Sequence, residues 1–553
     1  MLSALSAAIF LALAPTVAAM VPREPDRAAL AAYVRARLGD ADGDAATALA
    51  GYHAALHAYP DNDILASRVL RQAIVQGDSR IMLDTARQLD ARNHLSSDSR
   101  FLLIVDAINR RDLAVARAQL DRLEKESLFG FTSPIIRAWL ALDAHAAQPL
   151  NELSSPAVDP AFSSYYDEHR ALLLLAAGKT DEGISILRPL FNDFGSGRNV
   201  RLKLLAANAL VMKGRRDDAR AILDGDDPLL VTARLRLESG QILARPVLTT
   251  SQALADLLLR LASDVNRERV TPMALTLARA GLMADPQLTE SRLFTAMLLG
   301  SIGQPRLGLG LLPTAQGELF AKPLADARIQ LLVKDGHLAE AVKLAASEVN
   351  VPDATDSDWT RLADLYTDQE QYSDAASAYA KAIAIVTARD GADKVPWSYY
   401  LLHGGALDKA GRWPEAKVQL AEAARRGADQ PVALNYLGYA QLERRENLAE
   451  AEKLIERAAA LRPDDPAIMD SLGWTYFIRG QHDKAIATLE RAAMAEPAEP
   501  TINEHLGDAY WQVGRRIDAR YAWTAALPHA DEVQTKRLRA KIDRGVTPET
   551  AAP

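Results

Sequence analysis

The chain contains no cysteine among its 553 residues. This absence excludes disulfide bonds, thiol catalysis, thiolate-bound metals and a lipid attached to an N-terminal cysteine. Aromatic residues make up only 6% of the chain, whereas alanine and leucine are abundant. Because alanine and leucine are strong helix formers and poor strand formers, this composition favours helices over sheets.

The chain also lacks an excess of positive charge, since 64 Lys and Arg stand against 72 Asp and Glu for a formal net charge of −8. A mildly acidic balance gives no electrostatic reason to expect nucleic-acid binding. After the N-terminus, no apolar run approaches the roughly 20 residues that a membrane-spanning helix needs. The length makes a single compact core unexpected.

One uncharged apolar run lies at the N-terminus, from Leu2 to Ala14, and small residues follow it up to Ala19. This pattern is typical of an export signal and predicts that residues 1–19 are a signal peptide. No Lys or Arg precedes the run, so an uncleaved hydrophobic N-terminal helix is the alternative. Since no cysteine is present to carry a lipid anchor, we expect a soluble periplasmic protein.

Small residues recur at a nearly constant spacing in the C-terminal half. Successive separations are 34, 33, 34, 41, 35, 34 and 34 residues, at positions Ala274, Gly308, Ala341, Ala375, Ala416, Ala451, Ala485 and Ala519. A period near 34 with two amphipathic helices per unit is typical of the tetratricopeptide repeat. Turn glycines between the two helices are expected to adopt positive φ, at Gly303, Gly336, Gly411, Gly480 and Gly514.

The period predicts an all-α fold, a right-handed superhelical tetratricopeptide solenoid of about 12–15 helix pairs. Residues 20–228 match the period weakly and are interpreted as a degenerate N-terminal solenoid. Residues 250–545 match it well, and the change in regularity falls near 225–250. We expect the tail, residues 546–553, to be disordered.

In such a solenoid the first helices of successive units line a concave groove that binds extended protein segments. Aromatic rings mixed with amides and carboxylates suit peptide recognition, because rings supply contact area and polar groups fix the peptide backbone. Helical phase places such residues in the groove of the last regular units, with packing between repeats as the alternative for the two tryptophans. The predicted partner-binding residues are Asn435, Tyr439, Asp470, Trp474, Phe477, Glu504, Asp508 and Trp511.

No catalytic motif, cofactor motif or metal-ligand set emerges from the sequence. His53 and His57 have the i, i+4 spacing of a metal pair, but no Glu follows His53 and no third ligand is evident, so packing or solvent-facing histidines are favoured. We therefore expect no enzymatic activity, no metal and no cofactor. The Lys, Arg and Asn residues of a carboxylate clamp for chaperone C-termini are also missing from the groove positions.

The C-terminal fifth resembles a family of bacterial envelope tetratricopeptide-repeat proteins, which includes the lipoprotein adaptor of a carboxyl-terminal processing protease. The segments that carry the resemblance are 433–439, 448–455, 466–474 and 502–511. It implies a non-catalytic adaptor that binds a periplasmic processing protease and its substrates. A structural scaffold in an envelope assembly, polysaccharide-export or outer-membrane export machine is the alternative, and the sequence does not define the oligomeric state.

Overall fold

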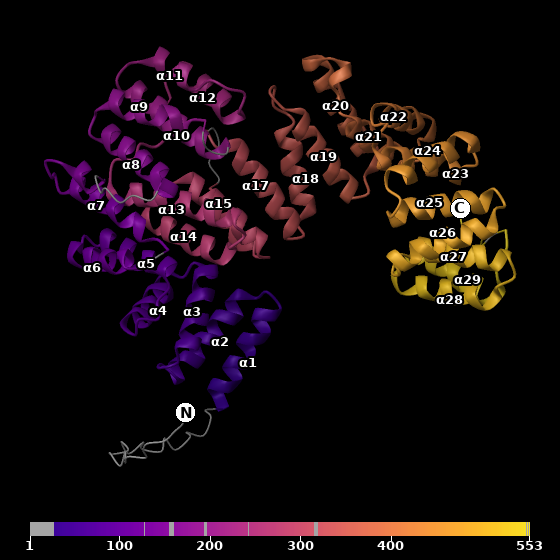
Figure 1. Cartoon of the computed structure of the whole chain (residues 1–553), viewed down its shortest axis with the longest axis horizontal. Coiled ribbons are helices and arrows are strands. Elements are labelled where there is room, and N and C mark those ends of the chain that lie inside the picture. The colour runs from indigo at the N-terminus through magenta and orange to yellow at the C-terminus, as the bar shows by residue number, and fades with distance from the viewer. Residues whose placement is uncertain are drawn as a thin grey trace, which may run out of the picture. The chain divides into compact units, whose positions relative to one another are not determined.

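The computed structural model describes residues 27–553 except 127, 154–159, 193–195, 242, 314–318, 549, 551 and 553. This part of the chain contains 29 α-helices, five short 3-10 helices and no strand (Figure 1). The predicted all-α fold of paired helices is confirmed. The predicted signal peptide, residues 1–19, lies outside the described residues. Among the described helices, none combines the length and apolar character needed to cross a membrane.

The chain divides into two compact units, Met1–His337 and Leu338–Pro553. The helices of the N-terminal unit are α1 (Arg27–Ala41), α2 (Ala45–Ala58), α3 (Asp63–Gln76), α4 (Ser79–Ala91), α5 (Ser97–Asn109), α6 (Leu113–Glu124), α7 (Ser133–Asp143), α8 (Ser163–Ala176), α9 (Thr180–Leu190), α10 (Ser196–Met212), α11 (Arg216–Ile222), α12 (Pro228–Glu238), α13 (Thr250–Arg267), α14 (Thr271–Ala284), α15 (Thr289–Ser301), α16 (Pro305–Leu309) and α17 (Ala321–Lys334), with η1 (Gly130–Thr132), η2 (Pro149–Leu153) and η3 (Pro160–Phe162).

The helices of the C-terminal unit are α18 (Leu338–Glu348), α19 (Asp356–Asp368), α20 (Tyr372–Asp390), α21 (Trp397–Lys409), α22 (Trp413–Arg426), α23 (Pro431–Glu443), α24 (Leu448–Leu461), α25 (Pro466–Ile478), α26 (His482–Ala495), α27 (Pro500–Gln512), α28 (Arg516–Ala526) and α29 (Glu532–Arg544), with η4 (Ala392–Lys394) and η5 (Leu527–His529).

Local sequence explains where the helices begin and end. The side chains of Asp44, Asn62 and Asp78 each accept a hydrogen bond from the backbone N–H three residues further on, which caps α2, α3 and α4. The predicted turn glycines adopt positive φ, between 72° and 86°, a conformation that costs glycine little. These glycines are Gly303, Gly336, Gly411, Gly480 and Gly514.

In the N-terminal unit, later helices cover the first helices of the early pairs. Helix α14 packs on α3 and α5, and α13 packs on α5 and α7, although more than 100 residues separate α7 from α13 (Figure 1). The Arg279 guanidinium of α14 donates hydrogen bonds of 2.9 and 2.7 Å to the Ile74 and Val75 carbonyls at the end of α3. The chain itself therefore covers the face formed by α3, α5 and α7, and a cavity of about 620 Å³ remains between α3, the start of α5 and α14.

This packing explains why the compact units do not divide where the repeat pattern changes. The sequence pattern changes near 225–250, between α11 and α13, but the division lies between His337 and Leu338. Helices α13 to α15 share one continuous apolar core with α2 to α8. The regularity of a repeat is thus a property of sequence, whereas the unit boundary depends on contacts between distant helices.

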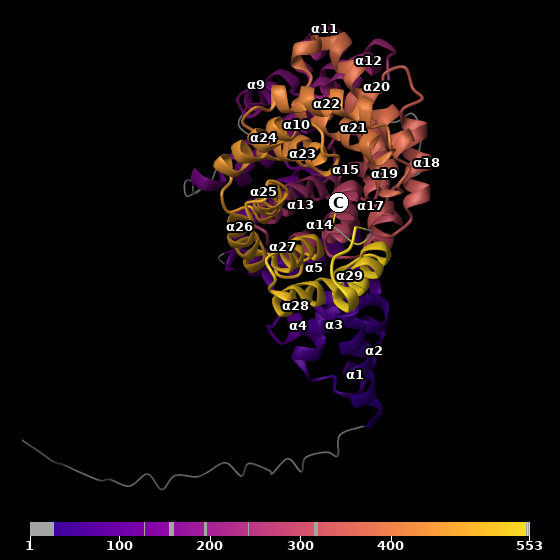
Figure 2. The same cartoon turned by 90° about the vertical axis from the view of Figure 1, so that its right-hand side faces the viewer.

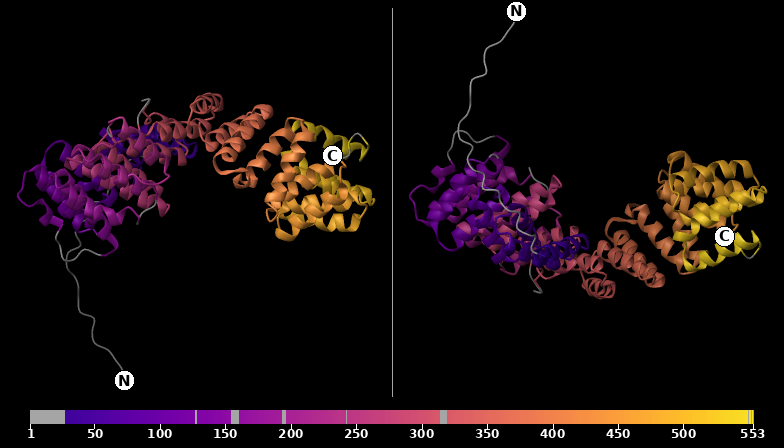
Figure 3. Two further views of the ribbon diagram at one scale, coloured as in Figure 1. Left: turned by 90° about the horizontal axis from the view of Figure 1, so that it is seen from above. Right: turned by 90° about the horizontal axis from the view of Figure 1, so that it is seen from below.

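The C-terminal unit stacks its pairs in order, α19/α20, α21/α22, α23/α24, α25/α26 and α27/α28. The first helices of successive pairs contact one another, α23 on α25 and α25 on α27, as Figure 2 shows. The same succession can be followed from orange to yellow in Figure 3. Alanine and glycine let the paired helices approach closely, so that Leu489 of α26 fills the space beside Gly473 of α25.

The described residues of the C-terminal tail contact the last helices. Disorder of residues 546–553 stays a prediction from the sequence. Val546 lies against the apolar cluster around Leu538, and the backbone N–H of Ala552 donates to the Asp508 carboxylate at 3.1 Å. Thr547 and Thr550 are joined by hydrogen bonds that close a turn. Apolar contact and a buried acceptor give this segment a place that its composition does not reveal.

Candidate functional site

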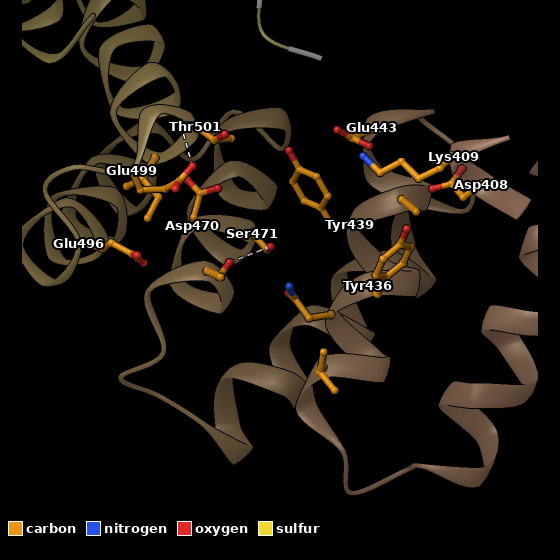
Figure 4. A pocket seen from close by; sticks show the side chains of 15 residues that line it. Asp408, Lys409, Tyr436, Tyr439, Glu443, Asp470, Ser471, Glu496, Glu499 and Thr501 are labelled. Carbon is orange, nitrogen blue, oxygen red and sulfur yellow. Dashed lines mark hydrogen bonds between the residues drawn. The ribbon is translucent and has the colours of Figure 1, made fainter. Parts of the chain in front are cut away.

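A cavity of about 480 Å³ lies on the face formed by α21, α23, α25 and α27, the first helices of four successive pairs. Two tyrosines of α23, Tyr436 and Tyr439, line it beside the amide of Asn435. Figure 4 shows the Tyr439 ring between Glu443 on one side and Asp470 with Thr501 on the other. Apolar lining comes from Val432, Ala440, Ala467 and Ile502.

The spacing along α23 explains why its side chains converge on the cavity. Residues three and four positions apart lie on the same face of a helix, so Tyr436, Tyr439 and Glu443 follow one another along the wall. Asn435 lies one turn before Tyr439. The N-terminal halves of α25 and α27 supply the opposite wall through Asp470, Ser471 and Thr501.

Three of the eight predicted partner-binding residues line this cavity, namely Asn435, Tyr439 and Asp470. Asn435 and Tyr439 are half-buried, as expected of residues in a groove wall. Asp470 is only 5% exposed, and its carboxylate contacts Nδ1 of His505 on α27 at 2.9 and 3.0 Å. Asp470 therefore also joins two repeats.

Trp474 and Phe477 lie between repeats. The Trp474 side chain is 3% exposed, and its ring stacks on His505 with 4.1 Å between centroids and on Phe477 with 4.5 Å. The neighbouring first helix covers the Trp474 ring in this structure, and partner binding by Trp474 stays a prediction. The ring packs between adjacent repeats, as in the alternative interpretation.

Glu504 and Asp508 are covered by the last helix, α29. Glu504 is 1% exposed and accepts hydrogen bonds from Arg537 and Lys541 at 2.6 and 2.7 Å. Burial opposes its ionisation, but these two cations outweigh it and lower the pKa of Glu504 to about 2. Asp508 accepts from Lys541 at 2.7 Å and from the Trp523 indole at 3.0 Å, while burial raises its pKa. In this structure both carboxylates contact Lys541 of α29, and partner binding by Glu504 and Asp508 stays a prediction.

Trp511 is half-buried and lies outside the cavity lining. The Arg516 guanidinium lies 3.8 Å from its ring centroid, and the Trp523 ring lies 5.5 Å away. A side chain at Gly545 would collide with the Trp511 ring, so the chain after α29 passes directly over it. Trp511 therefore packs against the segment that follows α29.

Helical phase did not separate the groove from the contact between first helices, because these two surfaces adjoin on each helix. Asn435, Asp470 and Glu504 occupy equivalent repeat positions, three residues before Gly438, Gly473 and Gly507. Their exposure falls along the row, from half-buried Asn435 to fully buried Glu504, because α29 closes the end. The repeat pattern alone does not show which repeat is the last one and is therefore covered by the capping helix α29.

Sequence reasoning missed several residues of the cavity. Tyr436 and Ser471 stand two positions before the repeat glycines, and Glu443 stands five after, so these positions define the groove face of the repeat. The heptad spacing of Tyr436 and Glu443 was the available signal, because it repeats on one face of a helix.

Carboxylates dominate the electrostatics of the cavity. Its lining contains Asp408, Glu443, Asp470, Glu496 and Glu499 against one cation, Lys409. Burial raises the pKa of Glu443, although the nearby Arg444 cation lowers it in part. Burial likewise raises the pKa of Tyr436 to about 12 and that of Tyr439 further, so both phenols stay neutral and can donate hydrogen bonds.

The N-terminal unit contains a second cluster of charged groups, buried where α8, α10, α13 and α15 meet. Glu168, His169 and Asp256 are each fully buried, and their potential ligand atoms lie within 4.8 Å of one another. Three arginines reach the same carboxylates: Arg260 contacts Glu168 at 2.9 Å, Arg198 contacts both carboxylates, and Arg201 contacts Asp256.

These arginines make the cluster an internal ion-pair network, because their charges already neutralise both carboxylates and repel a further cation. Arg201 also contacts Glu290 of α15 at 2.5 Å, which extends the network across four helices. Burial lowers the pKa of His169 to about 4, so its imidazole is neutral at physiological pH and accepts a hydrogen bond from the Trp139 indole at 3.2 Å. The ion-pair network therefore joins α8, α10, α13 and α15.

Residues 401–466 and 467–499 match family models described as tetratricopeptide repeat. The chain contains tetratricopeptide repeats. The matched segment includes α21 to α26 and therefore most of the cavity wall. A segment of 56 residues is 46% identical to the TPR repeat-containing protein PA4667 of Pseudomonas aeruginosa, covering 10% of this chain and 10% of that relative.

Similar solved structures include YrrB, described as a TPR protein with an unusual peptide-binding site, at 18% identity over 33% of this chain and 89% of that one, with a TM-score of 0.27. The Cut9–Hcn1 structure is 14% identical over 94% of this chain and 96% of that one, with a TM-score of 0.36. PilF of Pseudomonas aeruginosa is 17% identical over 39% and 97%, with a TM-score of 0.32.

Proposed function

We propose that this protein is a non-catalytic scaffold that binds a segment of a partner protein in the cavity lined by α21, α23, α25 and α27. The observation that carries the proposal is the cavity itself, where two tyrosines and an amide stand among carboxylates on the first helices of tetratricopeptide repeats. Stacked helical repeats create extended concave surfaces of this kind, and rigid aromatic rings contribute contact area at low entropic cost.

We further propose that the scaffold acts in the bacterial envelope and brings substrates to a processing protease. The support is the apolar run from Leu2 to Ala14 with small residues after it, together with the resemblance of segments between 433 and 511 to envelope adaptors. Three of these segments coincide with α23, α24 and α25, so the resemblance and the cavity share the same repeats.

Site-specific photocrosslinking in cells that produce the full chain tests the binding site. A p-benzoylphenylalanine replacing Tyr436 stands in the cavity wall, and the same group replacing Met494, which is 83% exposed on α26, serves as the matched control. We expect a protein adduct from position 436 that position 494 does not give. Identical adducts from both positions, or none from 436, would contradict the proposal.

The protease role needs its own measurement. The purified chain is added to the protease recovered in such an adduct, and cleavage of a model peptide is followed with time. We expect the rate to rise with added chain and to saturate near equimolar scaffold. Recovery of export-machine components without a protease would favour the alternative structural scaffold.

A further inference from the structure

The carboxylates of the cavity are incompletely neutralised by the protein. Asp408 pairs with Arg444 at 2.5 Å, and Asp470 contacts His505. Glu443 has a 4.0 Å ion-pair contact with Arg444, and its carboxylate also accepts a hydrogen bond from the Tyr439 hydroxyl. Within the described chain, Glu496 and Glu499 form no ion pair, and the Glu499 carboxylate accepts one hydrogen bond, from the backbone N–H of Thr501 at 3.3 Å. Negative charge therefore faces the cavity from both walls.

The distribution of these carboxylates discriminates between kinds of cation. Although all five are described, no three of them bring ligand atoms within 4.8 Å of one another, as a compact metal site requires. Figure 4 shows Glu443 and Glu499 on opposite sides of the Tyr439 ring. Separated carboxylates suit several charges carried along a chain better than a single ion.

The other lining groups fit the same kind of guest. Val432, Ala440 and Ala467 offer apolar surface to the methylene stems of lysine or arginine, whose charged heads remain among polar groups. The faces of Tyr436 and Tyr439 attract cations. The buried Oδ1 of Asn435 is a further acceptor in the wall and has no hydrogen-bond partner among the residues that the structure describes.

Building on the proposed function, we infer that the cavity selects a basic partner segment, with lysine or arginine side chains set between Glu443 and Glu499. An acidic segment is repelled by the same carboxylates, so charge gives the site its specificity as well as attraction. Burial disfavours the ionised form of Glu443 and raises its pKa. A partner cation beside this carboxylate would stabilise the ionised form.

Fluorescence anisotropy with the full chain tests this inference. The probes are three labelled dodecapeptides in which alanine alternates with lysine, with glutamine or with glutamate. We expect the lysine peptide to bind about tenfold more tightly than the glutamine peptide, with the glutamate peptide weakest. The advantage of the lysine peptide is expected to shrink as salt rises, because ions screen exposed charges.

A matched pair of variants assigns the effect to the cavity. Combined Glu443→Gln and Glu499→Gln substitutions keep the side-chain shapes and are expected to remove most of the lysine preference. Glu450→Gln on α24 removes an exposed carboxylate outside the cavity and is expected to leave the preference unchanged. Thermal unfolding by circular dichroism checks that each variant remains folded.

The outcomes separate this inference from the proposed function. Equal binding of the lysine and glutamine peptides, or an equal loss in the cavity and control variants, overturns the charge selection but keeps peptide binding. Displacement of the lysine peptide by millimolar Mg²⁺ at constant ionic strength would show a metal site and also overturn the selection. Failure of every peptide to bind at millimolar concentration would overturn both proposals.

Discussion

The two units use the same helix pair and differ in what covers the face of its first helices. In the N-terminal unit, α13 and α14 lie on α3, α5 and α7, and the buried network of Glu168, Asp256 and three arginines joins the layers. The N-terminal cavity of about 620 Å³ thus lies between two layers of the same chain, α3 and α5 on one side and α14 on the other. In the C-terminal unit, the cavity of about 480 Å³ lies on the corresponding face of α23 and α25, with no second layer of described helices lining it. A repeat that binds its own chain becomes a core, whereas one left uncovered can bind another protein.

The difference also shows how each unit uses charge. Around Asp256 the cations and carboxylates neutralise one another inside the protein, so the network contributes to which helices meet. Around Glu443 and Glu499 the negative charges face the cavity and are only partly neutralised by the described chain, in which Glu443 has a 4.0 Å contact with Arg444 and Glu499 forms no ion pair. Asp256 is therefore a structural carboxylate, whereas Glu443 and Glu499 are candidates for recognition.

Asp256→Ala is expected to have the largest effect, because it removes a buried carboxylate that two buried arginines, Arg198 and Arg201, both contact. Breaking a buried ion pair from one side costs about 3–5 kcal/mol. Hydrogen–deuterium exchange followed by mass spectrometry should show faster exchange in α8, α10 and α13, with the C-terminal unit unchanged. Asp181→Ala, which removes an 81% exposed partner of Arg215, is the control and should cost less than about 1 kcal/mol. Equal effects of the two variants would contradict a structural role for the network.

Acidification is expected to weaken the N-terminal unit first. The unfolded chain binds a proton at His169 near pH 6.5, whereas burial lowers the pKa of the folded form to about 4. Protons therefore favour unfolding between these values, so this stability is complete above pH 6.5 and lost as the pH falls to 4. The loss amounts to about 3 kcal/mol at the lower limit.

The measurement is urea unfolding at pH 7 and pH 4.5, followed by exchange in each unit separately. In the C-terminal unit, Glu504 has its folded pKa lowered to about 2, so its contribution is present above pH 4.5 and lost only below it. Loss of the C-terminal unit at a higher pH than the N-terminal unit would contradict this order.

Glycine-to-alanine substitutions within single pairs are expected to have smaller effects and to separate two kinds of close contact. At Gly51 of α2 a Cβ would lie 2.5 Å from the Ala32 carbonyl oxygen, and at Gly473 it would lie 2.6 Å from Cγ of Leu489. Overpacking costs about 1–3 kcal/mol. Because a side chain can move more easily than a backbone carbonyl, Gly51→Ala should cost more than Gly473→Ala in thermal unfolding. The reverse order would show that the pairs of the C-terminal unit are the tighter ones.

Much of the fold could be predicted from the sequence, because the repeat is a local pattern. Helix pairs, turn glycines such as Gly480, and contacts such as Leu489 beside Gly473 depend on residues within one or two repeats. The closure of α14 on α5 could not be predicted, since it depends on helices more than 150 residues apart in the chain. The repeat period of the sequence does not indicate which helices far apart in the chain contact one another.

The candidate site was predicted only in part for a related reason. Asn435 and Tyr439 line the cavity as expected, whereas the equivalent positions of the last repeat, Glu504 and Asp508, are buried by Lys541 of α29. Helical phase gives the direction of a side chain, but its exposure depends on the neighbour that follows. The final repeat differs because its neighbour is a single capping helix.

The absence of natural cysteine permits the most direct test of the difference between the units. Ala467→Cys places a thiol on the exposed cavity wall of α25, and Ala107→Cys places one on α5 at a site that is 2% exposed. Maleimide labelling of each single-cysteine chain is timed with and without the bound partner segment. Rapid labelling at 467 that the partner suppresses, with slow labelling at 107 in both states, is the predicted result. Slow labelling at 467 in the free chain, or no protection by the partner, would contradict the account.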